Sequence, residues 1–424
     1  MSEYTDQLDM EFVRGQFPAL AKDWAFFDNA GGSQTLQGAM DRIVEFLTHR
    51  DVQIGGSYEI SQLAAEALMD GRRAAQTFVN AARPEEIVFG PSTTVLVQTL
   101  AAAMRSQFEP GDEIIVTHAD HESNIGPWER LREFGVVIKV WPIDTSSMQL
   151  RLEDLAPLMG PRTKLVCVHH VSNILGSINP VGEIADFVHR HGAKICVDGV
   201  AYAPHRAIDV TAWDVDYYIF SLYKCYGPHT AIMYGKYELL AELDGLYHYF
   251  YGKDKVPGKL EPGNPNYELA YSMTAVVEYV QALGRRAGSD AEGRALFEAG
   301  FAAIARQEEV LTNRLLDWLG ARNDCRVIGD PGNGGNLRVP TISFRVEGVN
   351  SGAVARGMDD HKVAIRFGDF HSRRLVERLG EDHDDGVVRV SMVHYNTLTE
   401  LERMLSALPD VLSGAELTLA ADAG

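Results

Sequence analysis

The feature that most constrains the fold is a series of short apolar segments that alternate with helix-like segments between Pro91 and about residue 235. The segment KLVCVHH (164–170) has the composition of a buried strand, and VGEIADFVHRHG after it carries apolar residues at helical spacing. Strands that alternate with helices form mainly parallel sheets covered on both faces. We therefore expect an α/β fold whose ligands bind at the carboxyl ends of the strands. The other strand-like segments are EIIVTH (113–118), VVIKVW (136–141), KICVDG (194–199), YYIFSL (217–222) and TAIMYG (230–235).

The length of the chain indicates two lobes, because 424 residues exceed what one hydrophobic core usually organises. A helical pattern over 267–319, rich in Ala, Leu and Glu, suits a connector between them. Beyond it, strand-like segments at 341–346, 362–367 and 387–392 are separated by helix-like segments at 351–360 and 397–412. We assign residues 26–266 to a large ligand-binding lobe, 1–25 and 267–414 to a small α/β lobe with the connecting helix, and 415–424 to a flexible tail.

Composition excludes several classes of partner. With 39 Lys and Arg against 59 Asp and Glu, the net charge of −20 argues against nucleic acid and anionic membranes. The four cysteines lack the spacing of a metal site or a disulfide framework, which fits a reducing compartment. The N-terminus has no signal-peptide pattern, and no apolar stretch approaches the roughly 20 residues of a membrane span. We expect a cytoplasmic protein without a metal ion.

Two residues with useful chemistry follow strand-like segments. Lys224 comes directly after YYIFSL, and burial there would favour the neutral amine that a Schiff-base nucleophile needs. Asp198 ends KICVD, where it could pair with a protonated ring nitrogen. The two are 26 residues apart, about one strand–helix–strand repeat. Taken singly, each also fits an ordinary role, a surface lysine at a strand end and a helix-capping aspartate.

Three further segments offer polar groups near strand ends. His121 in THADHESNIGPW could stack on a flat ligand or be a loop histidine of no consequence. Asn173 in HHVSNILG could bind a ring hydroxyl or form a turn. Ser92, Thr93 and Thr94 precede a helical segment, where hydroxyl and N–H groups make either an anion site or an ordinary N-cap.

In this order the motifs resemble those of fold-type I pyridoxal-phosphate enzymes of the class V aminotransferase family, in particular its cysteine desulfurase-like and selenocysteine lyase-like branch. The similarity extends from FFDNAGGSQ (26–34) to VVRVSMVHYNT (387–397), and its most specific parts are HHVSNILGSINPV, VDGVAYAPH and FSLYKCYGPH. The resemblance implies a large lobe with a mainly parallel seven-stranded sheet, a small C-terminal α/β lobe and pyridoxal 5'-phosphate as cofactor.

The resemblance also implies roles for single residues. Lys224 would hold the cofactor through a Schiff base and move the α-proton of the substrate. Asp198 would pair with the ring nitrogen, His121 would stack on the ring, and Asn173 would bind the ring hydroxyl. The matching phosphate contacts are Thr93, Thr94, Ser221 and, in a loop that reaches into the partner subunit's site, Gly263 and Asn264.

That loop, EPGNPNY (261–267), implies a homodimer with composite active sites. On the substrate side, Arg389 matches the arginine that clamps the α-carboxylate through two hydrogen bonds. Asn29 and His371 are the other residues that we expect beside the amino-acid substrate.

The chain departs from the family where desulfuration requires a thiol. Desulfurases of this branch carry a mobile cysteine shortly after an Arg-x-Gly, and here RFGDFHSRRL (366–375) has His371 at that position. Cys325 lies too early in the chain, and strand alternation would direct Cys225 away from Lys224. Tyr223 replaces a common His, and Ala201 replaces a common Gln that supports the ring hydroxyl. The pattern keeps the cofactor site and puts persulfide transfer in doubt.

We therefore expect β-elimination of the C–S lyase type, which needs no enzyme cysteine. His371, Asp369, His229 and Tyr223 are candidates to assist the leaving group, although His371 and Asp369 also fit a solvated loop. A class V transaminase, an amino-acid epimerase and a non-catalytic cofactor-binding protein are the alternatives. The loops at 50–60 and 245–262, which carry several Gly and Tyr residues, fit either a pocket entrance or a dimer interface.

Overall fold

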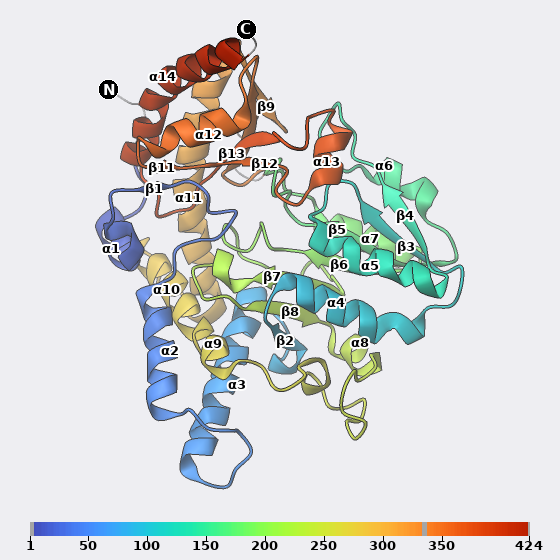
Figure 1. Ribbon diagram of the computed structural model, residues 1–424. Coiled ribbons are helices and arrows are strands. Elements are labelled where there is room, and N and C mark those ends of the chain that lie inside the picture. The colour runs from blue at the N-terminus through green and yellow to red at the C-terminus, as the bar shows by residue number, and fades with distance from the viewer. Residues whose placement is uncertain (1–3, 333–336, 423–424) are drawn as a thin grey trace.

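The computed structural model describes residues 4–332 and 337–422 and is built around a seven-stranded sheet (Figure 1). The strand order is β2-β8-β7-β6-β5-β3-β4, and β8 is antiparallel to both of its neighbours while β7, β6, β5, β3 and β4 pair in parallel. The mainly parallel seven-stranded sheet is thus confirmed. The strands are β2 (Ile87–Gly90), β3 (Glu113–Thr117), β4 (Val137–Trp141), β5 (Thr163–His169), β6 (Lys194–Asp198), β7 (Tyr217–Ser221) and β8 (Ala231–Gly235).

Helices cover both faces of this sheet, which explains why its strands are apolar throughout rather than alternating. In β7, Tyr217 and Ile219 join a core with α4 and α5, whereas Tyr218 and Phe220 join a second core with α3 and α10. All four side chains are fully buried. The helices of this part are α2 (Gln37–His49), α3 (Glu59–Val79), α4 (Thr93–Met104), α5 (Gly126–Glu129), α6 (Leu152–Leu155), α7 (Val181–Arg190), α8 (Tyr237–Glu242), α9 (Tyr267–Tyr271) and α10 (Met273–Arg286).

A second sheet of four strands, in the order β12-β13-β10-β9, lies at the top of Figure 1 and has its own core. The predicted strand at 362–367 is wrong in one respect, because the segment divides between two sheets at the buried Ile365. Before that residue β11 pairs with β1 near the N-terminus, and after it β12 pairs with β13. The elements are β1 (Ala25–Phe26), β9 (Cys325–Ile328), β10 (Thr341–Val346), β11 (Val363–Ala364), β12 (Arg366–Gly368), β13 (Val387–Ser391), α1 (Met10–Gly15), α12 (Ser351–Asp359), α13 (Arg373–Arg378) and α14 (Leu398–Asp422).

One long helix, α11 (Gly293–Gly320), packs against both parts of the molecule. Its first half contributes Phe297 and Phe301 to the core of the large sheet, and its second half contributes Leu311 and Leu315 to the core of the small sheet. The predicted lobe boundary at residue 266 stays a prediction, and it falls between the last strand of one sheet and the first of the other. Helix α14 runs to Asp422, past the start of the predicted flexible tail, whose last two residues, 423–424, lie outside the described residues.

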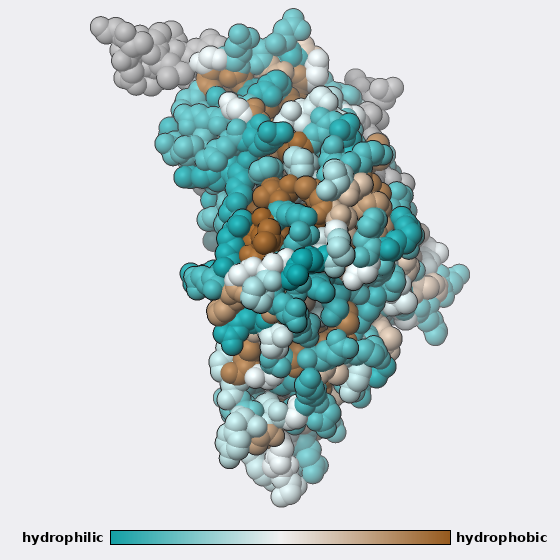
Figure 2. Space-filling view, turned by 90° about the vertical axis from the view of Figure 1, so that its right-hand side faces the viewer, coloured by the Kyte–Doolittle hydropathy of each residue, from teal (hydrophilic) through white to brown (hydrophobic). Residues whose placement is uncertain are grey.

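The face of the molecule on the β4 side is largely hydrophilic, with hydrophobic side chains gathered in a patch near its middle (Figure 2). None of the helices in the described ranges combines the length and the hydrophobicity that crossing a bilayer requires.

Candidate active site

The strand ends β5, β6 and β7 and the start of α4 surround a cavity on the large sheet. It contains every residue that the sequence predicts to bind the cofactor from within one subunit. The parallel arrangement explains this, because the carboxyl ends of neighbouring strands meet at one edge of the sheet. The lining consists of Ser92, Thr93, Thr94, His121, Ser123, His169, Val171, Asn173, Asp198, Val200, Ala201, Ser221, Tyr223 and Lys224.

Lys224 ends a short 3-10 turn that follows β7, and its half-buried side chain lines the cavity. Burial, followed by the positive charge of Arg389, lowers the pKa of Lys224 to about 8, although Asp198 and Asp28 oppose the shift. The next residue, Cys225, is fully buried in the core away from the cavity, and burial raises the pKa of its thiol. The predicted orientations of this pair agree with the structure.

Asp198 ends β6 with a buried carboxylate whose Oδ1 accepts a hydrogen bond of 2.9 Å from the Val200 N–H. Among the described residues, no cationic side chain pairs with it within 4.0 Å. Burial raises the pKa of Asp198 to about 6. A carboxylate that faces a cavity and forms no ion pair within 4.0 Å fits a ligand with a protonated ring nitrogen.

This burial predicts an effect on stability. Since the pKa of Asp198 rises from 3.8 to about 6 on folding, the folded state keeps a proton that the unfolded chain has lost between those pH values. The stability of the cofactor-free protein therefore falls as pH rises through this window, and the penalty persists at neutral pH. Asp198→Asn should therefore raise the free energy of unfolding of the cofactor-free protein at neutral pH by up to about 3 kcal/mol. We expect a higher melting temperature for the cofactor-free variant at pH 7.5 by calorimetry, with the difference vanishing toward pH 4. A lower melting temperature at pH 7.5 would contradict this account.

His121 presents a neutral ring to the cavity. Its Nδ1 accepts a hydrogen bond of 3.1 Å from the Ser123 N–H and lies 2.8 Å from the Ser123 hydroxyl. Burial, followed by the charge of Lys224, lowers the pKa of His121 to about 4. A neutral, fixed imidazole is suited to stack on an aromatic ligand without adding charge to the site.

The start of α4 supplies an anion site at one end of the cavity. Ser92 caps the helix by accepting a hydrogen bond of 3.2 Å from the Val95 N–H. The hydroxyls of Thr93 and Ser221 lie 2.6 Å apart, so they come together from α4 and the end of β7. Thr94 is exposed on the first turn. Hydroxyls beside the free N–H groups of a helix N-terminus fit a phosphate group.

Arg389 reaches the site from β13 of the small sheet. Its guanidinium donates hydrogen bonds to Asp28 Oδ1 (3.1 Å) and to the Asn173 carbonyl (3.2 Å). The guanidinium carbon lies 3.6 Å from the centre of the Phe370 ring. Burial lowers the pKa of Arg389 to about 10, so it remains charged at neutral pH. A buried, oriented cation at this point suits an α-carboxylate.

The loop after β12 closes over the same region. Asn173 Nδ2 donates to the Phe370 carbonyl (3.0 Å), and the Ser372 hydroxyl donates to Asn173 Oδ1 (2.8 Å). The Asn173 amide therefore ties the two lobes together, with one Nδ2 hydrogen left for the predicted ring contact. Phe370 and His371 both have positive φ, 50° and 58°, a strained conformation that costs roughly 1–3 kcal/mol per residue.

His371 is exposed at the tip of this loop, and its ring centre lies 5.2 Å from that of His121. Its carbonyl accepts a hydrogen bond of 2.8 Å from the Glu122 N–H, which fixes the loop on the large lobe. Burial would raise the pKa of Asp369, but hydrogen bonds from Arg373 and the His371 N–H lower it overall. Asp369 thus stays ionised and is a poor proton donor.

Asn29 differs from the other predicted substrate contacts. Its Nδ2 faces the Phe26 and Ser391 carbonyls at 2.8 and 2.9 Å, and its Oδ1 accepts a hydrogen bond from the Tyr395 hydroxyl. The side chain is buried and lies outside the cavity lining. These contacts support a role in joining the N-terminal segment to β13, and they give no support to direct substrate binding.

Tyr223 and His229 form a wall beside Lys224. Their rings stack with centres 4.7 Å apart and planes 9° from parallel. Burial raises the pKa of Tyr223, which keeps its hydroxyl available as a hydrogen-bond donor. Tyr223 lines both the cofactor cavity and a second, polar cavity that also contains Asp28, His229 and Arg366. The stacked pair therefore separates the cofactor region from this outer space.

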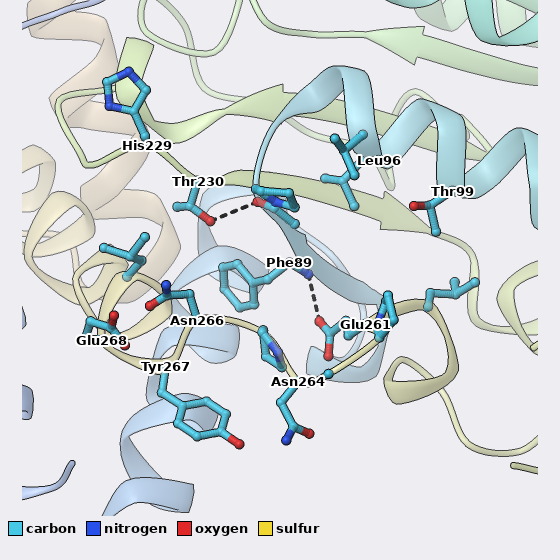
Figure 3. Close-up of a pocket in the computed structure, with 18 of the residues that line it drawn as sticks. Phe89, Leu96, Thr99, His229, Thr230, Glu261, Asn264, Asn266, Tyr267 and Glu268 are labelled. Atoms are coloured by element: carbon cyan, nitrogen blue, oxygen red, sulfur yellow. Dashed lines mark hydrogen bonds between the residues drawn. The ribbon is translucent and has the colours of Figure 1, made fainter. Parts of the chain in front are cut away.

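Gly263 and Asn264 do not reach the cofactor cavity of their own chain. They line a different, larger cavity of about 590 Å³ between α4 and the loop before α9 (Figure 3). The loop is anchored by Glu261, which accepts a hydrogen bond of 2.8 Å from the Phe89 N–H and forms an ion pair with the buried Arg72. Both Gly263 and Asn264 have positive φ, which shapes a tight turn.

Sequence reasoning missed His169, the last residue of β5, which lines the cavity next to Asp198. Alternation along the strand directs the neighbouring His170 to the other face, where it stacks on Tyr202 with ring centres 3.6 Å apart. The sequence does show a histidine at the end of this strand, as it shows Asp198 at the end of the next one. It does not show the register between β5 and β6, so it could not decide whether His169 or His170 faces the cavity.

Comparisons with known proteins agree with this geometry. A sequence model described as aminotransferase class-V matches residues 25–404. The chain is 41% identical over 416 residues to aminotransferase-like protein FGM3 of Gibberella zeae, covering 96% of this chain and 100% of that protein. It is 34% identical over 417 residues to cysteine desulfurase-like protein ustD of Aspergillus flavus, covering 96% and 91%. The apo structure of cysteine desulfurase from Thermococcus onnurineus NA1 superposes with a TM-score of 0.85 at 26% identity, covering 96% and 98%.

Proposed function

The chain belongs to the class V aminotransferase family, a group of pyridoxal-phosphate enzymes, and we propose that it breaks a bond at the β-carbon of an amino acid by elimination. The predicted family, the prediction that the chain is an enzyme, and the predicted cofactor are confirmed. The finer assignment to a lyase that works without a persulfide cysteine rests on the residues of the site.

When bound, pyridoxal phosphate supplies an aldehyde that joins to amines and a ring that withdraws electrons from the α-carbon. In our proposal Lys224 holds the aldehyde and later takes the α-proton at its Nζ. His121 covers one face of the ring, Asp198 holds the proton on the ring nitrogen, and the start of α4 binds the phosphate. Arg389 orients the α-carboxylate.

The observation that carries the proposal is the position of the cysteines. All four lie within the described residues, and none lines the cofactor cavity. Cys167, Cys196 and Cys225 are fully buried in cores, and Cys325 is on β9 of the small sheet. His371 stands instead on the loop that covers the site. A reaction that stores sulfur on an enzyme thiol therefore has no thiol in place, whereas elimination needs none.

The leaving group then needs a proton donor rather than a nucleophile. His371 and Tyr223 suit this role best, because His371 lies over His121 and the neutral Tyr223 hydroxyl lines the cavity. His229 acts in our proposal through its stack on Tyr223. Asp369 is engaged with Arg373 and serves to hold the His371 loop.

The experiment that tests this function is a screen of amino acids that carry a leaving group on the β-carbon. Pyruvate, ammonia and the released thiol or related species are measured in parallel with the purified holoenzyme. Elimination predicts repeated turnover with pyruvate and ammonia in equal amounts. Keto acid formed only once per active site without an amino acceptor would instead indicate a transaminase, and loss of optical activity without pyruvate would indicate an epimerase.

Replacing cysteines provides a sharper prediction. We expect Cys325→Ser to retain turnover within about twofold of the original enzyme, because no step uses a thiol. Cys225→Ala removes the cysteine beside Lys224, and we expect only the modest loss of a core substitution, a few kcal/mol of stability at most. Steady-state kinetics and thermal melts separate the two effects. Loss of turnover in a folded Cys325→Ser variant would contradict the proposed chemistry.

We propose further that two copies of the chain build each active site. Gly263 and Asn264 do not line the cofactor cavity of their own chain, yet the loop that carries them is held rigidly by Glu261 and Arg72. Tyr247, on the same cavity, is 62% exposed, and Tyr249 and Phe250 beside it are 98% and 66% exposed. Apolar side chains of this size are commonly covered by a partner surface. In the dimer Asn264 would contact the phosphate bound by Thr93 and Thr94 of the other subunit.

Asn264→Ala tests this arrangement. We expect the variant to bind pyridoxal phosphate about tenfold more weakly by equilibrium titration, the loss of one hydrogen bond to a charged group. Asn266→Ala, which lines the same cavity two residues away, is the control and should bind normally. Sedimentation should show a dimer for all three proteins. A monomer with full cofactor affinity would overturn the composite site.

A further inference from the structure

Three neighbouring strand ends place a row of titratable side chains beneath the cofactor cavity. β3, β5 and β6 are adjacent in the sheet, and after or at their ends stand Asp120, His169 and Asp198. His169 and Asp198 are direct cross-strand partners. The exposed fractions of the three residues are 1%, 4% and 6%, so solvent does little to screen their charges.

The carboxylate of Asp120 is held in place by its contacts. Its Oδ1 accepts a hydrogen bond of 2.7 Å from Asn124 Nδ2, and its Oδ2 accepts one from the Thr117 hydroxyl. His169 Nδ1 lies 3.1 Å from the same Oδ2. These contacts suit a carboxylate that accepts hydrogen bonds, and His169 contacts it through a ring nitrogen that can carry a positive charge.

Several titratable groups surround His169 and Asp120, among them the fully buried Cys167, two residues earlier on β5, and His121, both of which the charge of Asp120 influences. His170 follows His169 in the chain and turns to the opposite face, where its Nδ1 lies 2.9 Å from the Tyr218 hydroxyl. Asp198 and, beyond it, Lys224 lie on the cavity side. Asp120 contacts the His169 ring, and Asp198 is the partner of His169 on the neighbouring strand. Without a positive charge near them, the two buried carboxylates would repel each other.

We infer that His169 is a positioning residue, charged between Asp120 and Asp198, that keeps Asp198 ionised and through it keeps the cofactor ring nitrogen protonated. The charges then alternate along the row: Asp120 is negative, His169 positive, Asp198 negative and the protonated ring nitrogen positive. Burial is the main cause that raises the pKa of Asp198; the negative charge of Asp120 raises it further, and the charges of Lys224 and then His169 lower it. The inference rests on the proposed place of the ring nitrogen beside Asp198 and does not depend on the elimination reaction.

His169→Asn separates charge from hydrogen bonding. An asparagine amide can still donate to Asp120 from the place of Nδ1, but it carries no charge. The holoenzyme is prepared with pyridoxal phosphate labelled with ¹⁵N in the ring, and the ¹⁵N chemical shift is followed from pH 6 to 9. We expect the original enzyme to keep the ring nitrogen protonated throughout and the variant to hold that proton at least tenfold more weakly.

The double variant Asp120→Asn with His169→Asn removes both charges together. It should recover most of the proton affinity that the ring nitrogen loses in His169→Asn. His189→Gln is the matched control, since His189 Nε2 lies 2.8 Å from Asp216 Oδ2 outside the cavity, and its ¹⁵N profile should equal that of the original enzyme. His169→Gln replaces His169→Asn if the latter does not fold. Dissociation constants for pyridoxal phosphate provide a second readout.

Two results would overturn the inference. An unchanged ¹⁵N profile in His169→Asn would show that His169 acts without charge, and a double variant as impaired as the single one would show that its role is packing. Asp198→Asn, measured in the same way, distinguishes the underlying proposal. If the ring nitrogen stays protonated in Asp198→Asn, its placement beside Asp198 is refuted. If the ring nitrogen loses its proton in Asp198→Asn but keeps it in His169→Asn, only the role of His169 is refuted.

Discussion

Lys224→Ala is expected to reduce turnover by a factor on the order of 10³ or more, because one side chain both holds the cofactor and moves the α-proton. The structure gives this amine a low proton affinity. With a pKa of about 8, roughly a tenth of the Lys224 amines are neutral at pH 7, against roughly one in three thousand for an ordinary lysine. The neutral fraction is the reactive one, so the buried position of Lys224 prepares it for attack on an aldehyde.

The measurement combines steady-state kinetics with gel filtration of the loaded protein. Lys224→Ala should still bind pyridoxal phosphate through the phosphate site and Asp198 but lose it during gel filtration, while its melting curve stays cooperative. Lys236→Ala is a control at the end of β8, where the lysine pairs with Asp214 and Asp216 away from the cavity. It should keep its cofactor. Normal turnover in Lys224→Ala would refute the assignment of this residue.

Arg389→Ala is expected to lower kcat/KM by a factor of roughly 30 to several thousand, which corresponds to about 2–5 kcal/mol for removing one partner of a buried charged pair. The loss should appear mainly in KM, because the α-carboxylate is bound in the ground state as well as in the transition state. Arg366→Ala is the matched control. Arg366 also faces Asp28, at 3.6 Å, but it is 57% exposed, so its removal should change kcat/KM less than threefold.

The same variant has a second expected effect, on pH dependence. The charge of Arg389 lowers the pKa of Lys224, so its removal should raise that pKa and move the rise in activity to higher pH. Arg389→Lys keeps a charge and should keep the pH profile while still weakening substrate binding. Equal affinity for α-carboxylate substrates in the original enzyme and Arg389→Ala would show that another group holds the carboxylate.

Much of the site was predictable because it is built from strand ends. Asp198 and Lys224 follow buried apolar segments, and in a parallel sheet such positions converge whatever the loops do. The strand at 341–346 has the predicted bounds, and Thr93 and Thr94, expected just before a helix, form the first two residues of α4. These features depend on local pattern and on a general rule of sheet geometry.

The features that escaped prediction depend on pairing between distant segments. Nothing local in the segment 362–367 indicates that it leaves one sheet for another at Ile365. The short strand β2 was not anticipated either, because it has only four residues and just Pro91 separates it from the N-cap of α4. Asn29 was expected beside the substrate, yet its hydrogen bonds to Ser391 and Tyr395 could be recognised only once β13 was placed. In each of these segments the structure depends on strand register or on contacts between residues far apart in the sequence, which the local sequence does not contain.

The ion pair between Asp28 and Arg389 joins residues that are 361 positions apart. During synthesis the strands that carry Asp198 and Lys224 leave the ribosome long before Arg389 does, and N-terminal regions generally fold first. We expect a nascent chain to acquire the features of the cofactor cradle well before it can recognise an amino acid. The reactive amine would then be covered by its cofactor before the completed protein meets its first substrate.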